Sequence, residues 1–342
     1  MKKLLAIVLL ILAAGAFYYS QKSDNQLTVL NWDYYIGPTT ISDFEKASGS
    51  SVVYELFKSN EEALAKIKAN PGVYDIVIPS DYMVDILKKE DLLEPLDKEA
   101  LANISNIPAE FRGSYFDPNL EYSVPYAFGT TGFGVNTKAF SGTTITWKML
   151  SEPQYKGKIA VIDDMRFVLG SVLMELGYSP NTVNPAEIDA AVALFQTVVP
   201  NIQKFTADSP VELMVAEGAM IAYSYNGDIL QMQDENENIR FLIPPYGTLK
   251  FLDSVVIPKD APHKEAALAF INFLLDPEVS AAITKETHYG NPNTAARAHI
   301  EADILENPTT FPPDTVVQKL QFVRDVGEDL GLYDKAWEKV KQ

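Results

Sequence analysis

Short apolar runs alternate with amphipathic segments along most of this chain. The runs QLTVLNW (26–32) and YDIVIPS (74–80) stop at polar residues or proline, as buried strands of an α/β protein do. Between them the spacing predicts a helix that buries Phe44 and Ala47 on one face and stops at Gly49. Strands and helices that alternate in this way predict βαβ units with right-handed crossovers.

Further alternating elements follow on both sides of an aromatic and glycine-rich segment. Ser59 is the expected N-cap of a second helix, which ends at Pro71-Gly72. The segment YSVPYAFGTTGFGVNTKAF (122–140) is typical of strands that cross between two lobes. Later elements are a strand at 155–164, a helix at 185–202, a strand, glycine turn and helix at 218–233, a strand and amphipathic helix at 254–279, and a helical tail at 314–342.

Carboxylates and aromatic rings gather where the predicted strands end. These places are Asn31-Trp32-Asp33, Ser80-Asp81-Tyr82, Asp163-Asp164, Tyr225-Asn226-Gly227-Asp228 and Phe251-Leu252-Asp253. Ligands of open α/β sheets bind in the crevice beyond the carboxyl ends of the strands. The sequence therefore predicts one site there, acidic and aromatic in character.

The first residues and the composition predict where the protein works. Lys2 and Lys3 precede an apolar run from Leu4 to Ala14 and a group of small residues, which indicates an export signal and linker over 1–26. An uncleaved N-terminal anchor is the alternative. The chain has no cysteine, so we expect no cysteine-linked lipid, disulfide or thiolate metal site. A net charge of −18 disfavours nucleic acid and anionic lipid as partners.

The motifs of common enzyme classes are missing from the sequence. It has no G-x-S-x-G elbow, Walker A loop or dinucleotide glycine fingerprint, and its three histidines have no metal-ligand spacing. Asp163 and Asp164 are adjacent on a predicted strand, so their side chains point to opposite faces and cannot flank one glycosidic bond. We therefore expect no catalysis, cofactor or metal, and keep a glycosidase or deaminase as the enzyme alternative.

A binding site for an extended cation explains the clustered residues better. Carboxylates pair with ammonium groups, while aromatic faces cover a methylene chain and attract the ammonium groups by roughly 0.5–2 kcal/mol each. A buried, unpaired ammonium costs several kcal/mol, so the spacing of the carboxylates would select the ligand. Closing two lobes over the ligand would exclude water from these contacts.

The chain resembles the periplasmic spermidine/putrescine-binding proteins, the capture components of polyamine ABC importers. The matching stretches, in order, are LNWDYYI, YDIVIPSDYMV, EYSVPYAFGTTGFGVN, PQYKGKIAVIDD, LDSVVIP, EAALAFINFLLDPEV and YGNPNTAAR. The resemblance implies an α/β, two-lobe periplasmic binding protein fold of type II, in which each lobe is a mixed sheet flanked by helices around a hinge. It also implies a monomer that delivers a polyamine to an inner-membrane ABC permease. The expected lobes are 27–134 with 252–301, and 135–251 with 302–342.

The resemblance also implies the ligand-binding residues. Carboxylates would pair with the amines, aromatic rings would wall the ligand and close the rim, and hydroxyls would come from the second strand end: Trp32, Asp33, Tyr35, Ser80, Tyr82, Asp164, Tyr225, Asp228, Phe251, Asp253 and Tyr289. Asp253 is the strongest candidate, because a carboxylate flanked by apolar strand has no evident structural partner.

Some positions depart from that family or have a structural explanation. Phe167 stands where the family has Glu, and Val323 stands where spermidine binders have Gln. These departures leave open another small organic cation or amino compound as the ligand, and a ligand-sensing subunit as the role. One of Tyr34 and Tyr35 is expected to be packing, and Asp81 can be explained as a helix cap.

Overall fold

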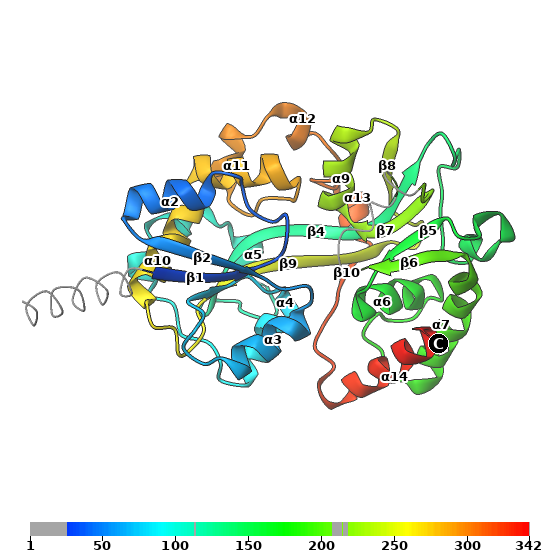
Figure 1. The fold of residues 1–342 in the computed structure, drawn as a ribbon, viewed down its shortest axis with the longest axis horizontal. Helices are drawn as coiled ribbons and strands as arrows, with labels where there is room; N and C mark the ends of the chain where they lie inside the picture. Colours follow the sequence, from blue (N-terminus) through cyan, green and yellow to red (C-terminus); the bar gives the residue numbers. More distant parts are fainter. Residues whose placement is uncertain (1–25, 113, 207–213, 215–217, 342) are drawn as a thin grey trace, which may run out of the picture.

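The computed structural model describes residues 26–112, 114–206, 214 and 218–341, so the predicted export signal lies almost entirely outside the described residues. The strands are β1 (Gln26–Asn31), β2 (Ser51–Leu56), β3 (Ile76–Val77), β4 (Ser123–Asn136), β5 (Ile159–Ile162), β6 (Ile202–Thr206), β7 (Ile221–Tyr225), β8 (Ile239–Leu242), β9 (Thr248–Val256) and β10 (Leu320–Phe322). Helices lie above and below the strands in Figure 1.

Helices of nine or more residues lie between many of these strands along the chain. The longer ones are α2 (Thr40–Ser48), α3 (Asn60–Ala69), α4 (Asp81–Lys89), α6 (Met165–Glu175), α7 (Pro185–Val198), α9 (Asn226–Glu235), α10 (Lys264–Leu274), α11 (Pro277–Thr287) and α14 (Leu330–Lys341). Short ones are α5 (Ala109–Arg112), α12 (Ala302–Leu305), α13 (Asp314–Val317), η1 (Lys98–Ala100), η2 (Ala102–Asn106), η3 (Met149–Ser151), η4 (Pro153–Tyr155), η5 (Val199–Asn201), η6 (Thr294–His299) and η7 (Gly327–Asp329).

Two long strands connect the two halves of one mixed sheet. The strand order is β2-β1-β3-β9-β4-β7-β5-β6, with β10 beside β9 and β8 beside β4. Strand β4 pairs antiparallel with β9 over 123–130 and then with β7 over 131–135. The first lobe therefore contains β1 to β3, the second contains β5 to β8, and the β4 and β9 ribbons run between them in Figure 1.

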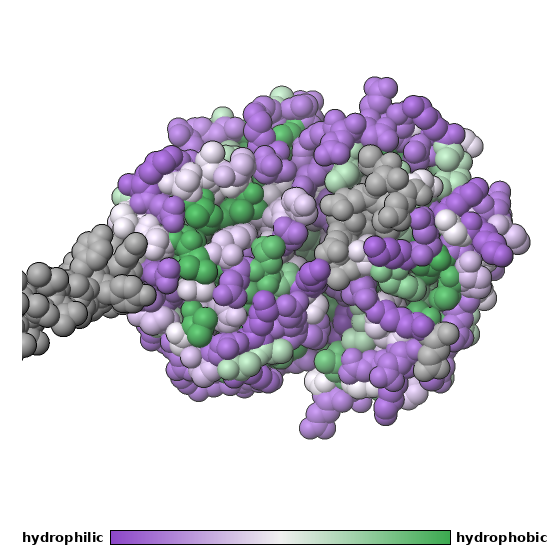
Figure 2. Space-filling model, in the orientation of Figure 1, coloured by the Kyte–Doolittle hydropathy of each residue, from purple (hydrophilic) through white to green (hydrophobic). Residues whose placement is uncertain are grey.

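Each lobe has aromatic residues in its core. In the second lobe Trp147 is fully buried, its ring lies 4.9 Å from Phe133 and 5.0 Å from Phe195, and its indole nitrogen donates to Ser171. Hydrophilic residues cover most of the face shown in Figure 2, consistent with the strongly negative composition. Among the described residues no single helix has the length and apolarity for a membrane span; α10 and α11 meet both criteria only as a pair, bent by 73°.

Several local predictions are confirmed. Helix α2 ends at Gly49, whose φ of 74° suits glycine, and Phe44 is buried, although Ala47 is exposed rather than on the buried face. Ser59 caps α3 by accepting a hydrogen bond from the Glu62 amide. Local capping signals thus located the helix ends correctly.

Other local predictions are wrong. The helix α9 starts directly at Asn226, with no glycine turn after β7. The tail is not continuously helical, because β10 pairs in parallel with β9 between the short α13 and the final helix. Residues 251–253 lie in the middle of β9 rather than at a strand end, since β9 is one of the strands that cross both lobes.

The predicted division of the chain between the lobes stays a prediction. Its boundaries at 134/135 and 251/252 fall inside β4 and β9, the strands that both halves of the sheet share. After the boundary at 301/302, Ile304 and Leu305 pack against Ala281 and Ala296 of the first lobe. The segment after 301 therefore begins in contact with the first lobe.

Candidate functional site

A cavity of about 130 Å³ lies between the lobes. It is lined by Trp32, Asp33, Tyr34, Tyr35, Leu56, Phe57, Lys58, Ser80, Ile162, Asp163, Asp164, Phe167, Thr206, Tyr225, Asp228, Phe251, Asp253 and Tyr289. The structure therefore brings ten of the eleven predicted binding residues to one cavity, and the exception is Tyr82. Their role in binding stays a prediction.

The turn after β1 contributes four consecutive residues to the cavity. Tyr35 is buried and its backbone carbonyl accepts from the Tyr126 hydroxyl at 2.6 Å. Tyr34 is 64% exposed and has a φ of 51°, so the backbone turns sharply there. Asp33 is exposed at the cavity and accepts from the Tyr34 amide, which places its carboxylate at the edge rather than in the interior.

Aromatic rings form a continuous wall from the first lobe to the second. The ring of Tyr35 meets that of Tyr289 edge-on at 4.9 Å, and Tyr289 lies 5.8 Å from Phe251. Phe251 in turn contacts Tyr225 at 5.5 Å and Phe167 at 6.2 Å. Trp32 covers another side and packs on Phe57 at 4.3 Å. Such a wall suits a ligand with an apolar stem.

Asp253 lines the same cavity, close to Tyr35 and Tyr289. It is 4% exposed, and its Oδ1 has no hydrogen-bond partner, as is true of the neighbouring Tyr35 hydroxyl. Burial raises the pKa of Asp253 to about 7, and the nearby hydroxyls of Ser80 and Tyr35 oppose that rise. An unpaired buried carboxylate oxygen is costly for the protein alone, so the arrangement favours a ligand that donates hydrogen bonds.

Two further carboxylates are held by the second lobe. Asp164 caps α6 by accepting from the Phe167 amide at 3.0 Å, and it also accepts from the Tyr225 hydroxyl at 3.0 Å. Burial and the charge of Glu61 raise the pKa of Asp164 to about 6. Asp228 accepts from the Tyr289 hydroxyl at 2.7 Å. Among the described residues that line the cavity, Lys58 is the one cation beside several carboxylates, so the cavity attracts positive charge.

Tyr82 is the predicted residue that lies outside the lining. Its hydroxyl donates a hydrogen bond to Glu61 of helix α3 at 3.0 Å, and the Tyr82 side chain is buried. Sequence reasoning did not select Phe57, Lys58 or Thr206, which also line the cavity, because it did not consider the ends of β2 and β6. The strand-end rule would have found Thr206, which is the last residue of β6.

The structure also gives the surroundings of three other positions that the sequence analysis discussed. Asp81 is not a cap: Ser80 occupies the N-cap position of α4, and the Asp81 carboxylate bonds to other elements. Asp163 and Asp164 both line the cavity but have different partners, since Asp163 accepts from Trp337 and Lys341. Val323 is buried but does not line the cavity.

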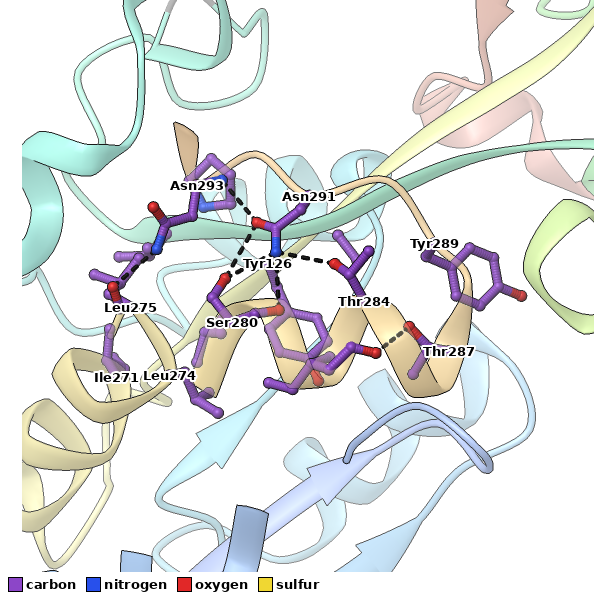
Figure 3. A pocket seen from close by; sticks show the side chains of 15 residues that line it. Tyr126, Ile271, Leu274, Leu275, Ser280, Thr284, Thr287, Tyr289, Asn291 and Asn293 are labelled. Atoms are coloured by element: carbon purple, nitrogen blue, oxygen red, sulfur yellow. Dashed lines mark hydrogen bonds between the residues drawn. The ribbon is translucent and has the colours of Figure 1, made fainter. Parts of the chain in front are cut away.

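A second cavity, lined by residues of β4, β9, α10 and α11, is too small for an organic ligand. It encloses about 20 Å³, enough for about one water molecule. Figure 3 shows Ser280, Thr284 and Asn291 satisfying one another at its wall, while the Tyr289 hydroxyl points away from them. Among the residues that the structure describes, no group of three or more His, Cys, Asp or Glu could hold a metal ion.

The fold and the central cavity define a two-lobed solute-binding protein. Residues 39–312 match the model of the bacterial extracellular solute-binding proteins, and the chain belongs to that family. It is 35% identical to the spermidine/putrescine-binding periplasmic protein of Salmonella typhimurium, over 97% of both chains. It is 33% identical to the putrescine-binding periplasmic protein of Pseudomonas aeruginosa, over 99% of this chain and 98% of the other.

Solved structures agree with these sequence matches. A Listeria monocytogenes protein attributed to a spermidine/putrescine ABC transporter superimposes with a TM-score of 0.89 and 35% identity, over 93% of this chain and 99% of the other. The predicted fold, a two-lobe mixed sheet with flanking helices, is confirmed. The relatives are binding proteins of transport systems rather than enzymes.

Proposed function

We propose that this protein binds putrescine, spermidine or a similar polyamine between its lobes and delivers it to an ABC permease of the inner membrane. It would act in the periplasm as a monomer, without catalysis. The names of the relatives at 33–35% identity support the ligand class and the compartment. The residues around the cavity support the ligand class independently.

One observation carries the proposal: the unpartnered oxygen of Asp253 inside an aromatic wall. An ammonium group would donate to that oxygen and, from the same position, face the rings of Tyr35 and Phe251. Asp164 and Asp228 offer carboxylates for other nitrogens, and rings line the space between. A neutral or anionic solute would leave these carboxylates without counter-charge.

Calorimetric titration with putrescine, spermidine, cadaverine and agmatine tests the ligand class. We expect saturable binding of at least one of these amines. If the folded protein gives no heat with any of the four at several temperatures, the polyamine proposal fails. Sugars and neutral amino acids serve as negative ligands, because they cannot neutralise the carboxylates of the cavity.

A matched pair of variants tests the site. Asp253→Asn removes one charge from the cavity, and Asp189→Asn removes one from the surface, where Asp189 pairs with Lys339 at 2.9 Å. We expect Asp253→Asn to weaken binding about 150-fold or more, which corresponds to the lower end of the 3–5 kcal/mol typical of breaking a buried ion pair. Asp189→Asn should bind as the wild type does. If Asp253→Asn folds and binds with normal affinity, Asp253 is not part of the binding site.

Phe167 supports a second candidate, a small organic cation other than a linear polyamine. Its buried ring closes the end of the cavity near Asp164 and packs edge-on against Tyr225 at 5.6 Å. An apolar ring at that position would favour a ligand with fewer charged nitrogens than spermidine. In the titrations above, binding of agmatine in clear preference to putrescine, cadaverine and spermidine would favour this candidate.

A further inference from the structure

We propose that Asp81, which does not line the cavity, is a positioning residue that fixes Asp253 and ties it to the segment 320–325 joining the lobes. The affinity for a cationic ligand would then depend on a carboxylate behind the binding wall. This inference rests on the proposed function, because it concerns how the same cavity holds a cation.

The first part of the argument is the bond from Asp81 to the strand that carries Asp253. Asp81 is the first residue of α4 and is 1% exposed. Its Oδ2 accepts from the backbone amide of Leu252 at 2.8 Å. Leu252 directly precedes Asp253 on β9, so this bond holds the backbone from which the unpartnered carboxylate projects. A charge-assisted hydrogen bond of this kind is short and strong.

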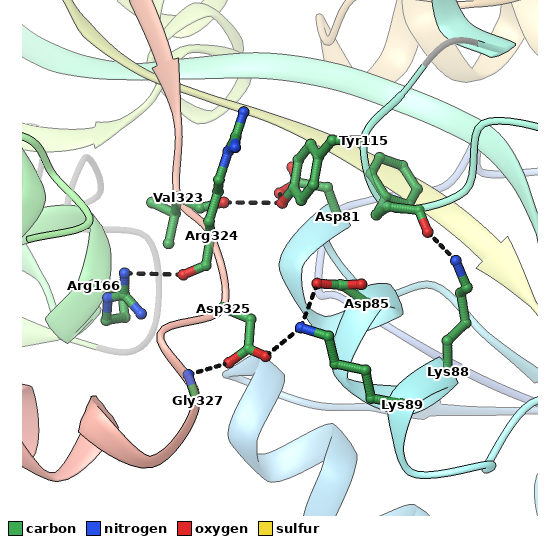
Figure 4. Close-up of polar contacts among 11 residues, drawn as sticks. Asp81, Asp85, Lys88, Lys89, Tyr115, Arg166, Val323, Arg324, Asp325 and Gly327 are labelled. Carbon is green, nitrogen blue, oxygen red and sulfur yellow. Dashed lines mark hydrogen bonds and ion pairs between the residues drawn. The ribbon is translucent and has the colours of Figure 1, made fainter. Parts of the chain in front are cut away.

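The second part is the link from Asp81, through Tyr115, to the segment 320–325. Figure 4 shows Asp81 Oδ1 facing Tyr115, whose hydroxyl lies 2.9 Å from that oxygen and 3.1 Å from the carbonyl oxygen of Val323. Val323 directly follows β10, the strand that pairs with β9. Asp81 and Tyr115 together therefore lie between α4, the strand that carries Asp253 and the segment 320–325.

That crossing segment is held by both lobes. The amide of Arg324 donates to Asn181 at 2.8 Å and its carbonyl accepts from Arg166 at 3.1 Å, both in the second lobe. Asp325 pairs with Lys89 of α4 in the first lobe at 2.8 Å, as Figure 4 also shows. A shift of one lobe relative to the other must therefore move the acceptor that Tyr115 reaches.

A phenol has a single hydrogen, which makes the contact dependent on the charge of Asp81. When Asp81 is ionised, Tyr115 donates to the carboxylate, because a charged acceptor is the stronger one. When Asp81 carries a proton on Oδ1, that proton is donated to the Tyr115 oxygen, and Tyr115 donates to Val323. Protonation of Asp81 thus adds a hydrogen bond from Tyr115 to Val323 in the segment 320–325, and ionisation of Asp81 removes it.

The charges around Asp81 connect this change to the ligand. Burial raises the pKa of Asp81 to about 7, and the negative charge of Asp253 contributes to the rise. Asp85, Lys250 and Arg324 are the other charged groups near the Tyr115 and Asp81 pair. A ligand ammonium at Asp253 offsets the negative charge that faces Asp81, so binding favours ionised Asp81 and releases protons near neutral pH.

Three variants test the inference: Asp81→Asn, Tyr115→Phe and the double variant, with Asp189→Asn as the surface control of equal charge. Calorimetry with putrescine and spermidine gives Kd at pH 8, and titrations at pH 7 in two buffers of different ionisation enthalpy give the protons released. We expect Asp81→Asn to weaken binding about tenfold, within the coupling range for residues of one network, and to reduce proton release. Tyr115→Phe should weaken binding less, and the double variant should bind about as Asp81→Asn does.

The possible results distinguish failure of this inference from failure of the proposed function. A folded Asp81→Asn protein that keeps wild-type Kd and proton release overturns the inference, even if its thermal stability falls. If Asp81→Asn does not fold, Tyr115→Phe decides, and wild-type Kd and proton release in that variant overturn it. Additive effects of the two substitutions would also contradict a shared network. If the wild type binds neither amine, the proposed function fails, and this inference fails with it.

Discussion

Asp253→Asn should make the ligand-free protein more stable while removing its ability to bind amines. The wild-type carboxylate is buried with one oxygen unpartnered, and burial raises its pKa from 3.8 to about 7. At pH 8 that shift of roughly 3 units corresponds to about 4 kcal/mol against folding, at about 1.36 kcal/mol per unit. The substitution removes the charge, although an imperfectly bonded amide costs about 1–3 kcal/mol in return.

The pH dependence of the stability gain distinguishes the removal of a buried charge from an improvement in packing. Because the folded pKa of Asp253 lies above its unfolded value, its contribution to stability is greatest below about pH 4 and is lost as pH rises towards 7. We therefore expect Asp253→Asn to gain about 2 kcal/mol at pH 8, a rise in Tm of roughly 4 °C, and little or nothing at pH 5.

Scanning calorimetry of ligand-free protein at both pH values checks this prediction, with Asp189→Asn as the control for loss of one negative charge. The reasoning is refuted if Asp253→Asn is no more stable than the wild type at pH 8. It is also refuted if the gain is the same at both pH values, since a burial cost of the charged form must disappear on protonation.

Two other predictions concern the pH dependence of binding and the core. Burial raises the pKa of both Asp253 and Asp164, and a bound cation favours their ionised forms, so putrescine affinity should fall at least about 30-fold from pH 8 to pH 5.5. A Kd that does not change over this range contradicts the assigned roles of these carboxylates. Trp147→Ala should cost about 4 kcal/mol of unfolding free energy in urea, because it leaves a cavity among Phe133, Phe195 and Tyr223. A loss below 1 kcal/mol would contradict that account, and binding should survive because Trp147 does not line the ligand cavity.

Most of the fold and the chemical character of the cavity could be predicted from the sequence. The apolar runs, the Ser59 cap and the Gly49 stop depend on residues a few positions apart, so the chain read in order is sufficient to locate them. Strand ends meet at one edge of a sheet, which is why Trp32, Asp164 and Tyr225 could be assigned to one site.

The sequence by itself determined most of the elements, the acidic and aromatic character of the site and the family, because these follow from local pattern and residue type. Only the tertiary structure decided that Asp253 lies mid-strand, that Tyr82 donates to Glu61, and that Asp81 bonds Leu252, 171 positions along the chain. Contacts at such separation depend on how the strands cross between lobes. No local pattern encodes that crossing, so the partner of each buried carboxylate had to come from the structure.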